Sequence, residues 1–455
     1  MRNNFKDLFG KAILDVNLEL MKSELRKSSV YANTQNRMLN ESMNERWRND
    51  SADGYIALGR ESIAQDEMPV LINDVKREIR RIFEKYGKVN ETIGCHPDFS
   101  HLENTQNQSD GYAITMFFDI AGSTKLGKIY GPSTTFNIKN TVIKYVIEII
   151  QAFDGHVHRI MGDAVMAFFR SNEKAQSGRE IDSAIDAINA GIYILEFMEQ
   201  VVRPALGDAK AEHPIGVRIG IDYAKKNEIV WGNYGVSGAF EVTATSYNVD
   251  VAAKLQQAAG TDNIMIGENM KELLGLGDEY LSVPFRYIKD ENGNEFRRAY
   301  PYVRPNYRVR GEQINYRQYV LDNKTYFRFL PYGLKNSNIC VSLTAERGDV
   351  CNQYLCPCSE SLDKGMSLTF HITYTGSLQS RLTVKSVKQN TGPDARAHNA
   401  TSPVTRIKEM QYYNGAWHAD VSESTRYHGL HHMKLIILDE KNNELDETVF
   451  SLYIR

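Results

Sequence analysis

The stretch MFFDIAGST, residues 116–124, decides the fold of this chain. Its first part belongs to an apolar run, residues 114–118, whose β-branched and aromatic side chains predict a buried strand. Asp119 follows where this strand leaves the core, and Gly122 with Ser123 is expected to open the next helix. The stretch therefore presents one carboxylate at the end of a core strand.

A second stretch, RIMGDAVMAFF at residues 159–169, has the same character. Apolar residues alternate on both sides of Gly162 and Asp163, which predicts a β-hairpin with its turn at these two residues. A hairpin packed beside the first strand would bring Asp163 and Asp119 to one edge of a sheet. Two carboxylates suit Mg²⁺ or Mn²⁺, which bind through one or two carboxylates together with substrate phosphates. Each aspartate taken alone is equally well explained as a turn residue that caps backbone groups.

Together the two stretches resemble the catalytic domain of the class III adenylate and guanylate cyclases, which has a strand–Asp–Ile–x–Gly–Ser segment and a Gly-Asp hairpin. The resemblance extends over about residues 110–270. It implies an α/β (α+β) sandwich with helices on a mixed sheet. It also implies a phosphorus–oxygen lyase that joins the ribose 3′-oxygen of a nucleotide to its own α-phosphate and expels pyrophosphate. Two Mn²⁺ or Mg²⁺ ions per active site would be held by Asp119, Asp163 and the carbonyl of Ile120.

The base-recognition positions of that family fall on Arg159 and Thr243. The family commonly has a lysine where this chain has Arg159, so the arginine is a departure. Its longer, planar donor fork could reach across the gap that a smaller, one-ring base leaves and donate to a pyrimidine O2 or O4. The plain alternative is a strand arginine that faces solvent.

The segment YNVDVAAKL, residues 247–255, matches the helix that carries the family's ribose-binding Asn and its transition-state Arg. Asp250 and Lys254 stand at those positions, on one face of the helix, and are the expected catalytic residues. Asp250 still accepts hydrogen bonds but carries a charge, and Lys254 is a point cation rather than a bidentate fork. A surface ion pair is the alternative. Lys225 and Lys289 lie near where the family keeps the cations that bind the triphosphate.

A further departure is the stretch VRIGID, residues 217–222, in which Asp222 stands where the family has a histidine. With these departures and its C-terminal region, the chain looks like the bacterial pyrimidine cyclases of anti-phage defence, which make cyclic CMP or cyclic UMP. In class III cyclases the metal carboxylates come from one subunit, and the base-reading and transition-state residues come from its partner. The resemblance therefore implies a head-to-tail homodimer with two sites, and an inactive monomer.

Composition and charge argue against several other classes of protein. The 455 residues are enough for two or three domains, and the 42% hydrophobic and 24% charged residues are ordinary for a globular protein. A net charge of −3 gives no bulk attraction to nucleic acid or to an anionic membrane, and no apolar run is long enough to span a bilayer. The first residues lack the apolar core of a signal peptide, and five cysteines favour reduced thiols. We therefore expect a cytoplasmic protein without nucleic-acid or membrane partners.

Four regions are predicted along the chain. They are a helical N-terminal region (1–100) that includes a helix over about 69–86, the cyclase domain (110–270), a hairpin with a connecting segment (271–335), and a small all-β sandwich (336–455). Residues 100–110 are interpreted as a polar linker, and residues 300–328, rich in Tyr and Arg, as a structural one.

The last region shows short alternating runs and no convincing helix. Two of its segments, 390–396 and 427–431, resemble the sensor domain of bacterial defence cyclases or are ordinary turns. Cys351, Cys356 and Cys358 lack the spacing of a zinc site.

The sequence thus favours a cyclase that converts CTP to cyclic CMP. Cytosine offers two adjacent acceptors, O2 and N3, to an arginine fork, whereas N3 of uracil is a donor, although Arg159 could also serve uracil O4. The alternatives are a uridylate cyclase, an adenylate cyclase with an unusual base pocket, and a degenerate domain that only binds nucleotide. By family resemblance the product would activate a separate effector protein that stops phage replication.

Overall fold

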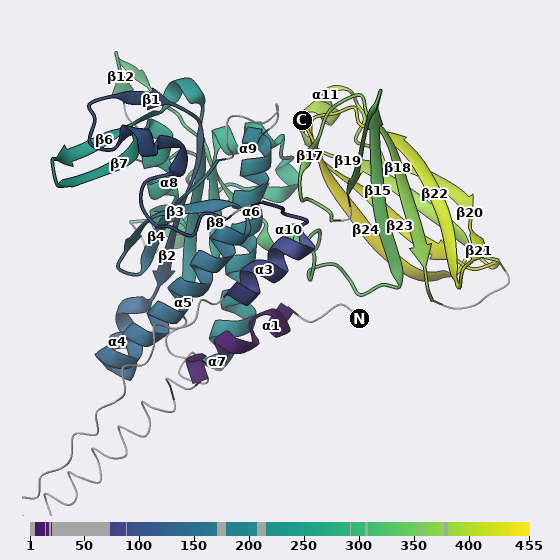
Figure 1. The fold of residues 1–455 in the computed structure, drawn as a ribbon, viewed down its shortest axis with the longest axis horizontal. Helices are drawn as coiled ribbons and strands as arrows, with labels where there is room; N and C mark the ends of the chain where they lie inside the picture. Colours follow the sequence, from purple (N-terminus) through teal and green to yellow (C-terminus); the bar gives the residue numbers. More distant parts are fainter. Residues whose placement is uncertain are drawn as a thin grey trace, which may run out of the picture.

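A computed structural model of the chain describes residues 5–13, 15–17, 20, 73–87, 89–170, 179–206, 215–291, 293–304, 308–354, 356–376 and 381–455. Two bodies lie side by side in it (Figure 1). The first is a sheet covered by helices, and the second is an all-β region at the C-terminal end of the chain.

A seven-stranded sheet forms the centre of the first body. In spatial order its strands are β3 (Gly155–Met161), β4 (Ala164–Phe169), β2 (Ala113–Ala121), β5 (Gly216–Ala224), β8 (Asn263–Gly267), β14 (Gln318–Leu321) and β9 (Leu281–Ser282). β5 and β8 run parallel, and the other neighbours run antiparallel. The mixed sheet that the sequence predicts is therefore confirmed.

The side chains of each strand alternate between two hydrophobic faces. Along β2, Met116 and Phe118 join the core under the long helices, whereas Phe117 packs against the opposite core. The helices over the first face are α5 (Pro132–Ala152), α6 (Arg179–Phe197) and α9 (Glu268–Leu274). On the other face, α8 (Tyr247–Ala258) packs against β8 through Val251 and Leu255. Helix α8 therefore lies on the face of the sheet opposite the three long helices.

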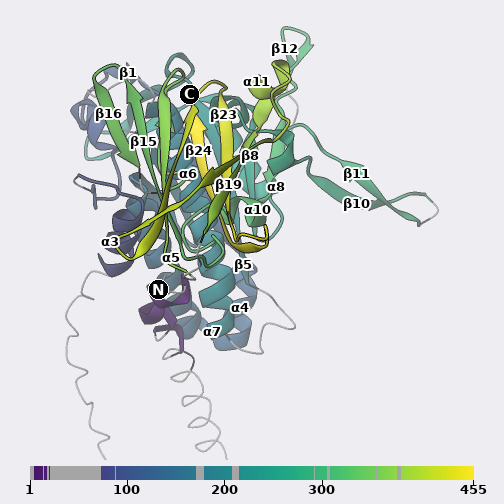
Figure 2. The same cartoon turned by 90° about the vertical axis from the view of Figure 1, so that its right-hand side faces the viewer.

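Shorter elements complete the first body. The remaining helical segments are α1 (Phe5–Leu8), α3 (Asn73–Ile82), α4 (Ser123–Tyr130), α7 (Arg203–Ala205) and α10 (Asn323–Phe327), with 3₁₀ turns η1 (Pro97–Leu102), η4 (Lys226–Glu228) and η5 (Asp278–Tyr280) and the π-helical turn η2 (Met198–Val202). A small sheet joins β1 (Gln108–Asp110), β6 (Val230–Val236) and β7 (Ala239–Thr245). The hairpin β10 (Phe285–Lys289) with β11 (Glu295–Ala299) projects from the body (Figure 2), and β12 (Arg308–Val309) pairs with β13 (Glu312–Gln313).

The C-terminal region consists of two five-stranded sheets around a common core. One contains β16 (Val350–Tyr354), β15 (Ile339–Arg347), β18 (Ser367–Tyr374), β22 (Ala416–Ser424) and β21 (Gln411–Tyr413). The other contains β17 (Ser361–Leu362), β24 (Glu444–Ile454), β23 (Gly429–Leu438), β19 (Thr383–Asn390) and β20 (Val404–Glu409). Neighbours are antiparallel except β17 and β24. The expectation of no helix here is wrong in one place, because Pro393 starts the short helix α11 (Gly392–Ala397).

The core of the first body takes in residues of the C-terminal region, which also has a core of its own. Cys358 and Tyr453 of the C-terminal region belong to the same buried cluster as the long helices of the first body. Asn189 Nδ2 on α6 donates to the carbonyl of Cys358 (2.9 Å), and the Tyr326 and Tyr453 hydroxyls lie 3.0 Å apart. Gly275, which ends α9 at φ +58°, leaves no space for a Cβ beside the ring of His428. The bodies are therefore fitted to each other along α6 and α9.

Several local predictions need correction. The interval 100–110 is not only a polar linker, since it contains the end of η1 and strand β1, which pairs with β6. The helix expected over 69–86 is α3, Asn73–Ile82, and residues 69–72 lie outside the described part of the chain. The same holds for most of the predicted N-terminal helical region, residues 21–68. Among the described helices, none combines the length and the apolar character that crossing a membrane requires.

Candidate active site

Asp119 and Asp163 lie next to each other at the ends of adjacent strands. β2 pairs with β4 so that Asp119 stands opposite Ala164, and the amide of Ile120 donates to the carbonyl oxygen of Asp163 (3.3 Å). Gly162 holds the hairpin turn at φ +68°, a left-handed conformation that costs glycine little. The local sequence thus fixes both carboxylates at one end of the sheet.

Cations and a hydroxyl surround the two carboxylates. Arg218 Nη2 on β5 donates to Asp119, and the Ser123 hydroxyl at the start of α4 donates to Asp163. The Lys139 ammonium on α5 lies 3.3 Å from Asp163. Burial alone would raise the pKa of Asp163, but the Ser123 hydroxyl and the Lys139 charge outweigh it and hold that pKa below its usual value. Asp163 is therefore ionised at neutral pH.

This donor set fits a hard divalent cation. The side chains of Asp119 and Asp163 are 18% and 25% exposed, so both carboxylates reach solvent. In the described part of the chain, no three His, Cys, Asp or Glu side chains gather into a metal-binding group. Two carboxylates leave most coordination positions to water, backbone carbonyls and substrate phosphates, which is how Mg²⁺ is usually held. Arg218 and Lys139 balance the negative charges of the two carboxylates.

The two predicted base-recognition residues meet at strand β7. Thr243 belongs to this strand, and Arg159 contacts it from β3. Arg159 on β3 forms a bidentate ion pair with Glu241 on β7, in which Nε lies 2.9 Å from Oε1 and Nη2 also donates to Oε2. The Thr243 hydroxyl, two residues further along β7, lies 3.0 Å from Nε2 of the buried His158. Arg159 thus faces a carboxylate as well as solvent. No sequence pattern indicated Glu241, because the contact joins strands of two different sheets.

Lys254 lines a cavity of 340 Å³ at the base of the projecting hairpin. Arg286 of β10 and Arg304 line the same cavity, whose lining contains no carboxylate. The guanidinium groups of Arg286 and Arg304 lie 5.6 and 5.5 Å from the centroid of the Tyr300 ring. Neither Asp119 nor Asp163 lines this cavity. The sequence did not identify Arg286 or Arg304, because both lie in stretches that read as a hairpin and a linker.

The other predicted residues lie outside this cavity. Asp250 is exposed on α8, and Lys225 is exposed just after β5. Lys289, at the outer end of β10, is also exposed and lies 3.8 Å from Glu295. The structure therefore brings Lys254 together with two unpredicted arginines rather than with Lys225 or Lys289.

Comparison with known proteins decides the family. Residues 105–291 match the adenylate and guanylate cyclase catalytic domain, and residues 320–452 match the adenylyl/guanylyl and SMODS C-terminal sensor domain. A protein of Escherichia coli named cytidylate cyclase is 39% identical over 434 residues, which cover 90% of each chain. The chain belongs to this cyclase family. It is a nucleotide cyclase, a lyase, with a class III catalytic domain and a C-terminal sensor-type domain.

A second curated relative agrees with this assignment. A cytidylate cyclase of Staphylococcus aureus is 30% identical over 389 residues, covering 83% of this chain and 87% of that protein. Among solved structures, that of the adenylyl cyclase CyaB from P. aeruginosa overlays with a TM-score of 0.36 and 20% identity, covering 47% of this chain and 95% of that one.

Two residues of β5 set the position of α8 in the cyclase domain. A Cβ at Gly220 would lie 2.2 Å from the carbonyl oxygen of Ala252, so only glycine allows α8 to approach the sheet this closely. Asp222, fully buried, accepts hydrogen bonds from Asn248 Nδ2 in the first turn of α8 and from the Tyr316 hydroxyl, both at 2.9 Å. The aspartate that replaces the family's histidine thus anchors the helix that carries Lys254.

The contribution of Asp222 to the stability of the cyclase should fall as the pH rises toward neutrality. Burial raises the pKa of Asp222 from 3.8 to about 7, and the hydrogen bonds from Asn248 and Tyr316 offset this only in part. Between these values the folded chain binds a proton that the unfolded chain releases. This contribution is fully present below pH 3.8 and is lost as the pH rises through about 7. Urea unfolding of the parent and of Asp222→Asn at pH 5 and pH 8 should show it as the difference between the two proteins.

The control for this prediction is a pair of variants in which an aspartate is replaced by asparagine. Asp222→Asn, which cannot ionise, should lose this contribution, whereas Asp110→Asn at an exposed carboxylate should leave the pH dependence as in the parent. An Asp222→Asn protein with the same slope as the parent would contradict the assignment.

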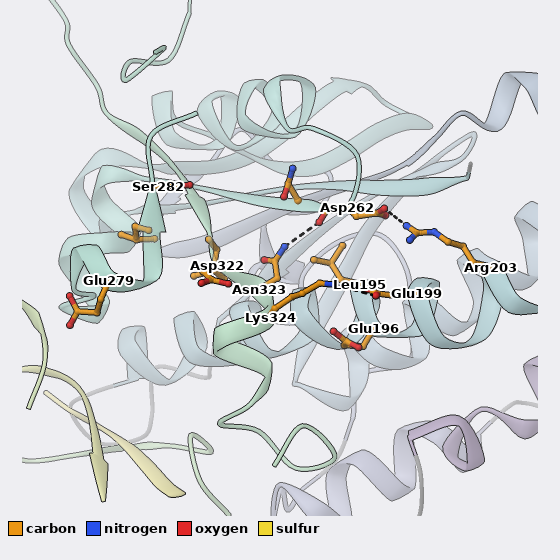
Figure 3. Close-up of a pocket in the computed structure, with 13 residues that line it drawn as sticks. Leu195, Glu196, Glu199, Arg203, Asp262, Glu279, Ser282, Asp322, Asn323 and Lys324 are labelled. Carbon is orange, nitrogen blue, oxygen red and sulfur yellow. Dashed lines mark hydrogen bonds and ion pairs between the residues drawn. The ribbon is translucent and has the colours of Figure 1, made fainter. Parts of the chain in front are cut away.

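A larger cavity of 520 Å³ lies beside α6, β9 and β14 (Figure 3). Carboxylates dominate its wall, and two of them have cationic partners: Asp262 pairs with Arg203, and Glu199 lies 3.4 Å from Lys324. None of the predicted site residues lines it. An anionic wall of this kind repels a nucleoside triphosphate, so the cationic surface described above is the better candidate for the active site.

Proposed function

We propose that the protein converts CTP to cyclic CMP and pyrophosphate. The observation that carries this proposal is the 39% identity, over 90% of both chains, to the E. coli protein named cytidylate cyclase. The local chemistry supports it, because the chain has an aspartate pair suited to divalent cations, a cationic cavity suited to phosphates, and an arginine at the base-recognition position. Conversion of UTP to cyclic UMP is the alternative that shares this machinery.

Asp119, Asp163 and the carbonyl of Ile120 would hold two Mg²⁺ or Mn²⁺ ions. Such ions polarise the α-phosphate, favour ionisation of the 3′-hydroxyl and neutralise the leaving pyrophosphate. Arg218 orients Asp119, and Ser123 with Lys139 orients Asp163 and keeps it ionised. These neighbours hold the ligand set in place before substrate arrives.

The phosphates and ribose would be bound by residues of α8 and the hairpin. Lys254 is proposed as the cation that balances the negative charge that develops at the α-phosphate, and Asp250 as the acceptor for a ribose hydroxyl. Arg286 and Arg304 would bind the β- and γ-phosphates, because they share the cavity of Lys254. Lys225 and Lys289, both exposed, would contribute long-range attraction for the triphosphate.

The working unit would be a head-to-tail homodimer. Neither Asp119 nor Asp163 lines the cavity of Lys254, which supports a second copy that brings the two groups to one substrate. The product would then act as a second messenger for a separate effector protein in anti-phage defence, with the C-terminal sensor-type domain controlling the cyclase.

The first experiment is a direct competition among substrates. The purified chain is incubated with Mn²⁺ and equal concentrations of ATP, GTP, CTP and UTP, and the products are separated by mass. We expect cyclic CMP as the main product, and none from an Asp119→Ala protein. Cyclic AMP as the main product would overturn the proposal. Nucleotide binding without any product would favour a degenerate, binding-only domain.

A further inference from the structure

We propose that Glu241 selects cytosine over uracil by accepting a hydrogen bond from the 4-amino group, while Arg159 donates to N3 and O2. This inference rests on the proposed function and names a specificity residue that the family resemblance does not place. It follows from the ion pair between β3 and β7.

The geometry of this ion pair leaves donors and acceptors for a base. Arg159 uses Nε and Nη2 to bind Glu241, which occupies two of its five N–H groups. The other three, two on Nη1 and one on Nη2, form the end of the guanidinium fork. Glu241 keeps lone pairs on both oxygens, because a carboxylate offers about four acceptor sites. The Arg159 and Glu241 side chains are 44% and 34% exposed, so a base can reach them.

The buried His158 accounts for Thr243, whose hydroxyl donates to it and so is not directed at a base. Glu241 Oε1 lies 3.2 Å from Nε2 of His158, a side chain without solvent exposure. The same nitrogen lies 3.0 Å from the Thr243 hydroxyl, and Thr243 itself is buried. His158 is in turn bound to the carbonyl of Gly94 (2.9 Å). Thr243 is therefore turned toward His158, and Glu241 is the residue of this group that faces outward with Arg159.

The remaining donors of Arg159 and a lone pair of Glu241 would together offer a base two donors and one acceptor. Cytosine presents the matching edge, with acceptors at O2 and N3 and a donor at the 4-amino group. Uracil has a donor at N3 and an acceptor at O4, so it meets Arg159 donor to donor and Glu241 acceptor to acceptor. Two of three contacts are therefore repulsive for uracil, and such unpaired groups are the main source of discrimination between similar substrates.

The test compares kcat/KM for CTP and for UTP in the parent and in Glu241→Gln. The glutamine has nearly the same shape, but its amide can donate to uracil O4. We expect the CTP/UTP ratio to fall by about tenfold or more, with activity on CTP falling and activity on UTP rising. Glu241→Asp keeps the negative charge on a side chain that is shorter by one methylene. It should lower the CTP/UTP ratio less than Glu241→Gln does.

The matched control is Glu409→Gln. Glu409 forms the same kind of bidentate pair with Arg381, at 2.8 and 3.2 Å, on the C-terminal region away from the cyclase sheet. This variant should leave the CTP/UTP ratio unchanged.

A substrate analogue separates direct base contact from a structural role. The triphosphate of 2-pyrimidinone riboside lacks only the 4-amino group of CTP. The parent should use it about tenfold less well than CTP, and Glu241→Gln should show little further loss. Equal losses on CTP, UTP and the analogue would mean that Glu241 only supports the fold, and would overturn the proposal. A parent chain that makes no cyclic CMP would instead refute the proposed function itself.

Discussion

Replacing Asp163 with asparagine is expected to reduce cyclic CMP formation by about a thousandfold at saturating CTP and Mn²⁺. The amide keeps the shape of the side chain but removes one of two anionic ligands, and loss of about 4 kcal/mol of metal-assisted stabilisation corresponds to that factor. The fold should survive, because the Ser123 hydroxyl can still donate to the amide oxygen. Initial rates followed by mass spectrometry or by pyrophosphate release would measure the effect.

Metal binding provides an independent readout for the same variant. Titration of Mn²⁺ followed by electron paramagnetic resonance should show weaker binding to Asp163→Asn than to the parent. Asp110→Asn, at an exposed carboxylate on β1, should change neither the rate nor the titration. Parent-like activity of Asp163→Asn would remove this residue from the metal site.

Two inactive chains are expected to restore activity when they are combined. In a head-to-tail dimer, Asp163→Asn disables one half of each site and Lys254→Ala the other half. Lys254→Ala alone should cost on the order of a hundredfold, since it removes a cation from the developing charge. Random pairing of the two variants gives one intact site in each mixed dimer, so co-expressed chains should recover about a quarter of the parent activity.

The control for this experiment is a pair of variants from the same half of the site. Asp119→Asn mixed with Asp163→Asn creates no intact site and should stay inactive. Recovery in that mixture, or no recovery in the first one, would refute the shared site. Purification through two different tags would isolate the mixed dimer.

The sequence predicted the elements whose signal is local. The apolar run before Asp119 and the Gly162 turn indicated β2 and the β3–β4 hairpin, because each depends on residues that are neighbours in the chain. Strand β7, which carries Thr243, lay in a stretch without clear alternation and was not predicted. It pairs with β6 in the small sheet, and this pairing produces no alternation of apolar and polar residues in the sequence.

The contacts that define the candidate site were less predictable. Glu241 meets Arg159 across two sheets, and Arg286 meets Lys254 only because the hairpin folds back to α8. The roles of these residues stay predictions until they are tested. Cys358 shows a similar limit: its spacing to other cysteines was the visible pattern, but the structure buries it between the two bodies.

The core that runs through both bodies makes the sensor-type domain a fixed part of the enzyme rather than a tethered accessory. A displacement of β24 would reach α6 directly, because Tyr453 packs against that core and well-packed interiors transmit strain. Removing the domain would expose the apolar side chains of the cyclase that it covers and make the remainder prone to aggregate. Exchange of this domain for that of a related cyclase would therefore need matching changes where β17 and β24 meet the first body, since Ser361 on β17 donates to Asp182 on α6.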